Sequence, residues 1–390
     1  MCVFELGHSY PHIYNMGVPV TYLPTDLEEK RAQNPMVSRV KGGDTITRTL
    51  VDRLVLTLTP MNEKPYNFIE KIKLYLSNYL DVNWDEYIPV SSGYGYNTGL
   101  AFKTNTGATL VIKYFDPDIS IREDFEYSEG SKLAYFKRQG VQLQLTGDVL
   151  QDLRAKGLIY PFILDLRDAF KTKATQIDCT LDVFNAPEYL NLTPVHFFDL
   201  YRQDKYTGQA KVGVVGDAKL PTVYIGKMRS ARSIMLYDKK QEGRDTLKVD
   251  EPELFEACRS WLRTEVRYTR DFDDADRVLD YILSADEDSM PILIGEVIAK
   301  TLTSKCRFLK YSRDSEKNVS RIPTDEAWDY LLKLSSEATM DFASHRLELT
   351  LAERKMNFIR RGVGGAKLLQ DIVNSEGREA LEDFIEQCLR

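Results

Sequence analysis

The stretch ATQIDCTLDVFN, residues 174–185, alternates between apolar and polar side chains and therefore predicts a β-strand. Successive side chains of a strand point to opposite faces, so Asp178 and Asp182 share one face. The apolar positions from Ile177 to Val183 share the other. We expect a strand that packs its apolar face on the core and presents two carboxylates on the opposite face.

Similar strand-like runs surround this one and are separated by turn residues. They are DRLVLTLTP (52–60), NTGLAFKT (97–104), ATLVIKYF (108–115), GVQLQLTGD (140–148), KVGVVGD (211–217), LPTVYIGKM (220–228), RSIMLYDKK (232–240) and WLRTEVRYT (261–269). Helical spacing is present in 66–80, 149–170, 193–203 (capped by Thr193) and 271–285. The order predicts an α+β fold with a mainly antiparallel sheet, built from two similar α/β units with helices on one face.

Three regions are expected along the chain. Residues 1–45 are rich in Pro, Gly and Asn and predict an irregular arm. Residues 46–285 would form the sheet domain, with units at about 46–135 and 136–285. After about residue 290 the strand pattern stops, so 286–390 predicts a helical C-terminal domain.

Composition is that of an ordinary globular protein, with 43% hydrophobic and 28% charged residues among 390 and a net charge of −7. The positive charge is nevertheless concentrated locally, in residues 200–240 and 350–368. Such runs are commonly solvated faces, but two of them on an acidic chain favour an anionic partner. Five scattered cysteines without CxxC spacing, and no signal-peptide or transmembrane pattern, favour a cytoplasmic protein away from membranes.

Several chemistries are excluded by missing motifs. The chain has no GxxxxGK[ST] phosphate loop and no GxSxG elbow, and its four histidines form neither HxH nor HExxH. Carboxylates on neighbouring strands could instead bind a hard cation, although ion pairing with Arg or Lys on an exposed sheet face is the commoner role for any one of them. Tyr237 ends an apolar strand beside Lys239 and is the candidate nucleophile, while a strand-end aromatic is the simpler alternative.

The run TVYIGKMRSARSIMLYDKKQE (222–242), followed by WLRTEVR (261–267), resembles the Rep_trans replication initiation factors. These are rolling-circle replication initiators of small plasmids and some filamentous phages. The Asp178-x-x-x-Asp182 strand, GVQLQLTGD and RIPTDEAWDYLLK (321–333) also fit, whereas Met235 stands where the family has a basic residue.

The resemblance implies a metal-dependent DNA nickase and ligase. Tyr237 would attack one origin phosphodiester, which gives a 5′-phosphotyrosine and a free 3′-OH primer. Asp178, Glu265 and then Asp182 would bind Mg²⁺ or Mn²⁺, and Lys239, Arg263 and Arg267 would neutralise phosphate. Further DNA contacts are expected at Lys227, Arg229, Arg232, Lys240, Arg354, Lys355, Arg360 and Arg361.

Two rival functions are weighed against the initiator. A non-catalytic, sequence-specific DNA-binding regulator on the same fold would use the two basic segments to grip phosphates. A tyrosine recombinase is disfavoured because no tyrosine follows Tyr330. Origin DNA is the expected partner, with a host helicase and a second copy of the chain as further candidates.

Overall fold

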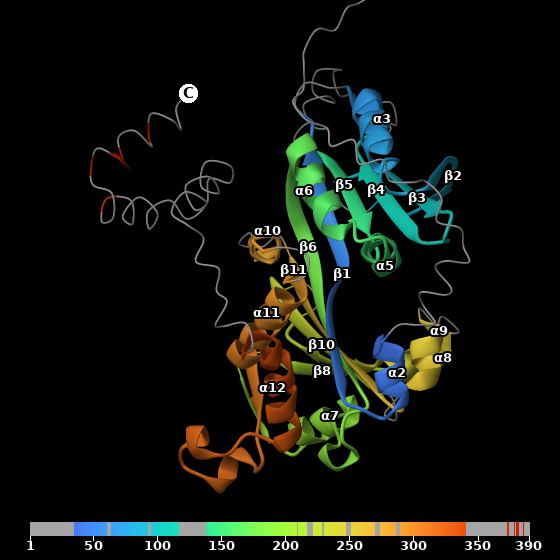
Figure 1. The fold of residues 1–390 in the computed structure, drawn as a ribbon. Coiled ribbons are helices and arrows are strands. Elements are labelled where there is room, and N and C mark those ends of the chain that lie inside the picture. Colours follow the sequence, from blue (N-terminus) through green and yellow to red (C-terminus); the bar gives the residue numbers. More distant parts are fainter. Residues whose placement is uncertain are drawn as a thin grey trace, which may run out of the picture. The chain divides into compact units, whose positions relative to one another are not determined.

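The computed structural model describes most of residues 35–340 (Figure 1). The described residues are 35–60, 64–92, 95–116, 136, 139–208, 210–216, 221–227, 230–246, 251–269, 274–285 and 289–340, with Val373, Arg378, Ala380, Leu381 and Ile385. By contact, the chain divides into two compact units, Met1–Thr339 and Met340–Arg390. The sheet described next belongs to the first unit.

A ten-stranded sheet forms the centre of this unit, in the order β2-β3-β4-β5-β1-β6-β11-β10-β9-β8, and all neighbouring strands are antiparallel. Its strands are β1 Ile46–Thr59, β2 Val82–Pro89, β3 Thr98–Thr104, β4 Thr109–Tyr114, β5 Val141–Leu145, β6 Lys171–Phe184, β8 Val212–Val215, β9 Thr222–Ile225, β10 Arg232–Asp238 and β11 Trp261–Thr269. A second, two-stranded sheet pairs β7 Tyr206–Gly208 with β12 Cys306–Phe308.

The ten strands form two halves with the same topology. From β1 outward the order is β5, β4, β3, β2, and from β6 outward it is β11, β10, β9, β8. The two long strands β1 and β6 pair with each other, so the halves join at the middle of one continuous sheet (Figure 1). This confirms the α+β class and the two similar units. However, β5 pairs with β4 and β1, so it lies in the first half and not at the start of the second.

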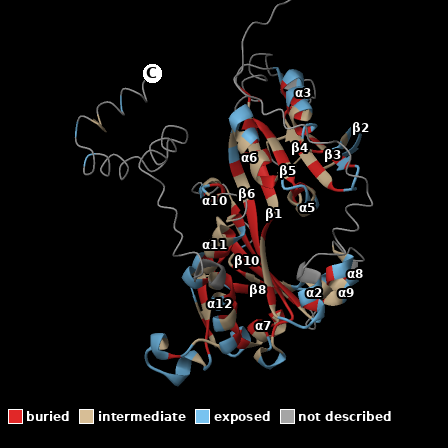
Figure 2. Ribbon diagram, in the orientation of Figure 1, coloured by how far each residue is buried: buried red, intermediate tan, exposed pale blue. Residues whose placement is uncertain are grey.

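Helices pack against this sheet. Their bounds are α2 Pro35–Lys41, α3 Pro65–Leu76, α5 Gly147–Ala155, α6 Ile159–Ala169, α7 Pro194–Arg202, α8 Lys239–Thr246, α9 Pro252–Ala257, α10 Asp274–Ile282, α11 Met290–Lys305 and α12 Glu326–Met340, with 3₁₀ turns at Glu188–Leu190, Arg313–Ser315 and Val319–Arg321. The apolar face of β6, from Ile177 to Val183, is buried in a core that also contains residues of α3, α5, α6, α10 and α11. Figure 2 shows this burial along the central strands.

The opposite face of the sheet is polar, and we call it the site face. At one end it carries a small apolar cluster in which Phe184 and Trp261 pack with Val40 of α2 and Leu254 of α9. Short helices therefore cover one end of the site face, while the long helices cover the other side of the sheet. The rest of the site face carries the charged residues singled out in the sequence.

Local departures from the expected elements have identifiable causes. Residues 149–170 form two helices, because Gly157 adopts φ +66° and its N–H donates to the carbonyl of Arg154, which ends α5. Residues 35–41 of the expected irregular arm form α2, with Pro35 at its first position. Strands β2 and β12 were not expected, and β12 interrupts the region predicted to be helical. The domain boundaries remain predictions, although α11 and most of α12 lie in the same compact unit as the sheet.

Candidate active site

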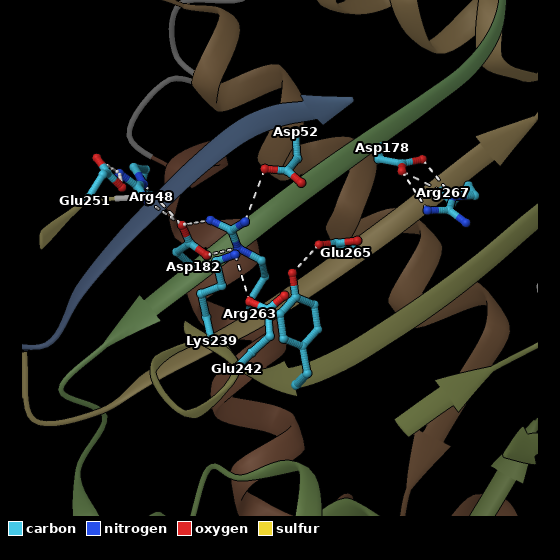
Figure 3. Close-up of polar contacts among 11 residues, drawn as sticks. Arg48, Asp52, Asp178, Asp182, Lys239, Glu242, Glu251, Arg263, Glu265 and Arg267 are labelled. Atoms are coloured by element: carbon cyan, nitrogen blue, oxygen red, sulfur yellow. Dashed lines mark hydrogen bonds and ion pairs between the residues drawn. The ribbon is translucent and has the colours of Figure 1, made fainter. Parts of the chain in front are cut away.

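Antiparallel pairing aligns the predicted site residues in rows across the site face (Figure 3). The rows are Tyr237–Arg263–Asp182–Arg48 and Ser233–Arg267–Asp178–Arg53, each read from β10 through β11 and β6 to β1. Glu265 lies between them, opposite Thr180 of β6. The strands that carry the tyrosine, the two aspartates and the glutamate are therefore neighbours with these faces aligned.

The hydroxyl of Tyr237 donates a hydrogen bond to Oε1 of Glu265 at 2.5 Å. Burial raises the pKa of Tyr237 well above its ordinary value of 10, and the negative charge of Glu265 raises it further. The resting side chain is therefore a neutral phenol whose proton points at a carboxylate. Tyr237 ends an apolar strand, as expected, but its hydroxyl is engaged with the neighbouring strand.

Glu265 has an unusual protonation equilibrium. Its residue is only 7% exposed, and burial raises the pKa of its carboxyl from 4.5 to about 7. The nearby charge of Asp52 is the next cause of this shift. A carboxyl that titrates near neutrality can accept a proton and return it, as general acid–base chemistry requires.

Asp182 is enclosed by arginines. Its carboxylate accepts bonds from Arg263 Nε at 2.7 Å and Nη2 at 3.0 Å, and from Arg48 Nη2 at 2.7 Å. Burial alone would raise its pKa, but the charges of Arg263 and Arg48 outweigh burial and hold the pKa below its usual range. Asp182 is 0% exposed, so this carboxylate orients Arg263 and has no free side for another ligand.

Asp178 is paired in a similar way at the next row. Arg267 donates to it from Nε at 3.0 Å and from Nη2 at 2.9 Å, and Gln176 Nε2 donates to both oxygens at 3.1 Å. The structure thus brings together Asp178, Glu265 and Arg267 from the predicted set. It also places an arginine on each predicted aspartate.

Asp52 is a site residue that the sequence pattern did not reveal. The β1–β6 register shifts between Val51 and Arg53, so Asp52 is the extra residue of a β-bulge. Its Oδ1 accepts a bond from Arg263 Nη1 at 3.1 Å, which places it on the site face (Figure 3). In the sequence, Asp52 is the first residue of the apolar run DRLVLTLTP, so it is read as the residue at which a strand begins and not as part of a site.

Two arginines near this network were also missed. Arg48 bonds Asp182 and Glu251 and lies over the rings of Phe184 and Trp261. Arg154 of α5 has a lowered pKa because of burial and repulsion from Arg48. Neither residue belongs to a recognisable motif, so only their spatial position identifies them.

The two lysines after Tyr237 do not continue its strand. Asp238 Oδ1 accepts a bond from the Gln241 N–H at 2.9 Å and so caps a helix, and α8 begins at Lys239. Lys239 is paired with Glu242 at 2.8 Å, and the ammonium of Lys240 donates to the carbonyl of Cys258. The strand expected over 232–240 therefore ends at Asp238, and Lys239 lies in α8 and not on a strand face with Tyr237.

The other predicted DNA contacts are scattered. Lys227 is exposed after β9, whereas Arg232 is bonded to Asp274 at 2.7 and 2.9 Å and faces α10. Arg229, Arg354, Lys355, Arg360 and Arg361 lie outside the described residues.

The oxygen donors of the site face fit the implied divalent cation only at one pair of carboxylates. Among the described residues, no group of three His, Cys, Asp or Glu side chains is arranged to hold a metal ion. Asp52 and Glu265, however, lie close enough for the charge of one to raise the pKa of the other. A hard cation with a preference for oxygen ligands would relieve this repulsion. The pair thus fits such an ion better than the arginine-bound Asp182 does.

None of the helices in the described residues is long and apolar enough to cross a lipid bilayer. The cysteines among these residues, Cys179, Cys258 and Cys306, are buried and not in disulfides.

Comparison of the sequence with known proteins finds one matching protein family. Residues 196–387 match the family model described as replication initiation factor. The chain is also similar to a solved structure of a rolling circle replication initiator protein from Geobacillus stearothermophilus, with 19% identity, a TM-score of 0.45, and coverage of 74% of this chain and 97% of that one. No curated protein matches the chain. The matched residues include Tyr237, Arg263 and Glu265, and this confirms the resemblance of the chain to the replication initiation factor family.

Proposed function

We propose that this protein initiates rolling-circle replication by nicking and religating one strand of origin DNA through Tyr237. The observation that carries the proposal is the hydrogen bond from the Tyr237 hydroxyl to Glu265, a carboxyl with a pKa of about 7. Two arginines, Arg263 and Arg267, flank this pair on the same strand. Nucleophile, proton acceptor and phosphate-binding groups thus converge on one face.

In the proposed reaction, the Tyr237 oxygen attacks the scissile phosphorus and the bond from phosphorus to O3′ breaks. Glu265 takes the phenolic proton as the attack proceeds, because free phenoxide is too scarce in this buried setting. The same carboxyl then supplies a proton to the departing 3′ oxygen. The products are a 5′-phosphotyrosine and a free 3′-OH, with every bond and proton accounted for.

Positively charged groups would stabilise the phosphate during transfer. Arg263 is held by Asp182 and Asp52, so its guanidinium is fixed before DNA arrives and loses little freedom on binding. Arg267 is fixed in the same way by Asp178, and Lys239 lies two residues after the tyrosine. Removal of the Asp182 carboxylate would thus lower activity by releasing Arg263, and we assign Asp182 a positioning role.

For the divalent cation we propose Asp52 and Glu265 as the ligand pair. The resemblance also implies Asp178 as a ligand, and in the structure its carboxylate is bonded to Arg267 and Gln176. When bound, Mg²⁺ or Mn²⁺ would polarise a phosphoryl oxygen. The phosphotyrosine preserves the ester bond, so religation is the reverse transfer to a 3′-OH and requires no nucleotide hydrolysis. This agrees with the absence of a phosphate-loop motif from the sequence.

The decisive experiment is incubation of Tyr237→Phe with a supercoiled origin plasmid and Mg²⁺. We expect no nicking and no covalent adduct, because the ring remains but the nucleophilic oxygen is gone. Tyr224→Phe, on the neighbouring strand β9, is the matched control and should nick normally. Wild-type nicking by Tyr237→Phe would refute the assignment.

The alternative function is a DNA-binding regulator without nicking activity. Salt-sensitive origin binding with no adduct in any divalent metal would favour it. Origin DNA is the partner in either case, and a host helicase and a second copy of the chain remain predicted partners.

A further inference from the structure

The site face extends beyond Tyr237 onto the first half of the sheet. The strand register aligns one row of side chains across β4, β5, β1 and β6, namely Lys113–Gln142–Thr57–Lys173. The next row, Val111–Gln144–Val55–Gln176, leads to the row that contains Asp178 and Arg267. From Thr57 to Arg53 the separation is four residues of one strand, or about 13 Å.

This part of the site face has a distinctive charge. On β1, β4, β5 and β6, the positions between Arg53 and the start of β6 carry four cations, Arg53, Lys113, Lys171 and Lys173, and no carboxylate. The whole chain has 59 acidic residues against 52 basic ones, so a face without carboxylates is unlike the average surface. We call these four residues, with Gln142 and Gln144, the cationic platform.

Two cations of the platform, Arg53 and Lys113, are poorly satisfied within the described structure. Arg53 donates to Gln144 Oε1 at 2.9 Å, but its buried Nε has no hydrogen-bond partner in the described structure. Lys113 has neither a hydrogen bond nor an ion pair there, and burial together with the charge of Arg53 lowers the pKa of its ammonium. The positive charges of Arg53 and Lys113 repel each other, and a bound anion would relieve this repulsion.

The amide groups of the platform add directional hydrogen bonding. Gln144 Nε2 donates to Gln142 Oε1 at 2.6 Å, so the two amides form a short chain that starts at Arg53. The amide nitrogen of Gln142 has no partner among the described residues and lies beside Lys113 across the strand pair. Cations and amides together can contact phosphate oxygens and base edges.

We propose that the cationic platform binds the single strand of origin DNA that continues past the scissile phosphate, and so holds it across the first half of the sheet. The inference rests on the proposed function, because that chemistry acts on one strand which must extend away from Tyr237. Five strand spacings, about 24 Å, separate β10 from β4 across the sheet, and the row of Tyr237 lies about 26 Å from the row of Lys113 along the strands. The path is therefore about 35 Å long. The first half of the sheet would thus contribute binding while the second half contributes chemistry.

The test uses the double variant Lys113→Gln/Lys171→Gln in the full chain. Binding is measured by fluorescence anisotropy, with oligonucleotides that extend in steps from the nick site in the 5′ or the 3′ direction. For wild type, we expect affinity to grow with extension on one side. In the double variant, the increase in affinity on extension should be about tenfold smaller. The slope of log K against log salt concentration should fall in magnitude by about 1.4, because two phosphate contacts are lost.

The matched control is Lys310→Gln/Lys317→Gln, which removes the same charge from the exposed segment after β12 and should retain the gain. Adduct formation on the shortest oligonucleotide should be equal in all three proteins, because Tyr237 and Glu265 are untouched. Thermal unfolding temperatures verify that the variants fold, and single Lys171→Gln provides a second measurement if the double variant is unstable.

Several results would overturn the platform. One is an affinity that depends on oligonucleotide length equally in the wild type and the double variant. A second is a loss of affinity in the control variant as large as in the double variant. A third is a loss of affinity that is seen only with duplex DNA. Failure of the proposed function is a separate outcome, since the wild type would then form no adduct even where length-dependent binding is intact.

Discussion

Glu265 combines burial with a nearby carboxylate, and this combination opposes folding at neutral pH. Between pH 4.5 and about 7 the folded protein holds more protons at Glu265 than the unfolded chain does. The free energy of unfolding therefore falls as pH rises through this window and stays lower above it. Such a strained group at a site is understandable if a cation or a transferred proton relieves it during function.

Glu265→Gln should therefore stabilise the metal-free protein at pH 8 by about 3 kcal/mol, and change the free energy of unfolding little at pH 4.5. Urea unfolding at both pH values in the presence of a chelator measures this difference. Glu253→Gln, an exposed glutamate on α9, is the control and should leave the pH dependence unchanged. Identical pH profiles for Glu265→Gln and wild type would contradict the elevated pKa.

The same variant separates metal binding from activity. Mg²⁺ should raise the unfolding temperature of wild type at pH 8, because a ligand that binds only the folded state stabilises it. Glu265→Gln should lose most of this increase, and so should Asp52→Asn. Retention of the full increase by both variants would exclude the proposed ligand pair.

At the scale of elements, alternation and turn residues were enough to predict most strands of the second half. β6, β10 and β11 follow the patterns closely, because each has one apolar face in the core and one polar face. β2 was missed, since the run VNWDEYIP lies at the edge of the sheet and is mostly exposed. An edge strand needs little apolar patterning, so its sequence carries a weak signal.

The candidate site was only partly predictable for a related reason. Tyr237, Arg263 and Glu265 lie in short motifs, whereas Asp52 reaches the site through a bulge formed between strands distant in sequence. Pairing of Asp182 with Arg48 is also a property of the β1–β6 register. No local pattern in either strand specifies that register, so the metal-binding role expected for Asp182 could not be tested by sequence alone.

At the junction between β10 and α8, the helix cap formed by Asp238 can be tested by substitution. Asp238→Ala should destabilise the protein by about 1 kcal/mol, because the N–H of Gln241 loses its acceptor at the start of α8. Asp238→Ser retains an acceptor and should restore most of the loss. Adduct formation should fall with Asp238→Ala and recover with Asp238→Ser, since α8 places Lys239 beside the tyrosine. A stable but inactive Asp238→Ser would show that the carboxylate itself takes part in the reaction.

At the scale of the whole molecule, the compact unit that ends at Thr339 should act independently of the rest. A chain shortened to residues 1–345 should keep its main unfolding temperature and form the adduct on a short oligonucleotide. Its affinity for duplex origin DNA should drop, because the basic residues at 350–368 are removed. Unchanged origin affinity would eliminate the C-terminal segment as the recognition element.

The pairing of β1 with β6 has a consequence for synthesis of the chain. Ile46 pairs with Phe184, so β1 leaves the ribosome long before its partner exists. At the usual rate of roughly 5–20 residues per second, the interval is on the order of ten seconds. During that time the first half can complete itself through β5, but the other edge of a fourteen-residue strand stays bare. Such an edge is a template for another nascent chain, so the yield of folded protein should depend on how closely ribosomes follow one another on the message.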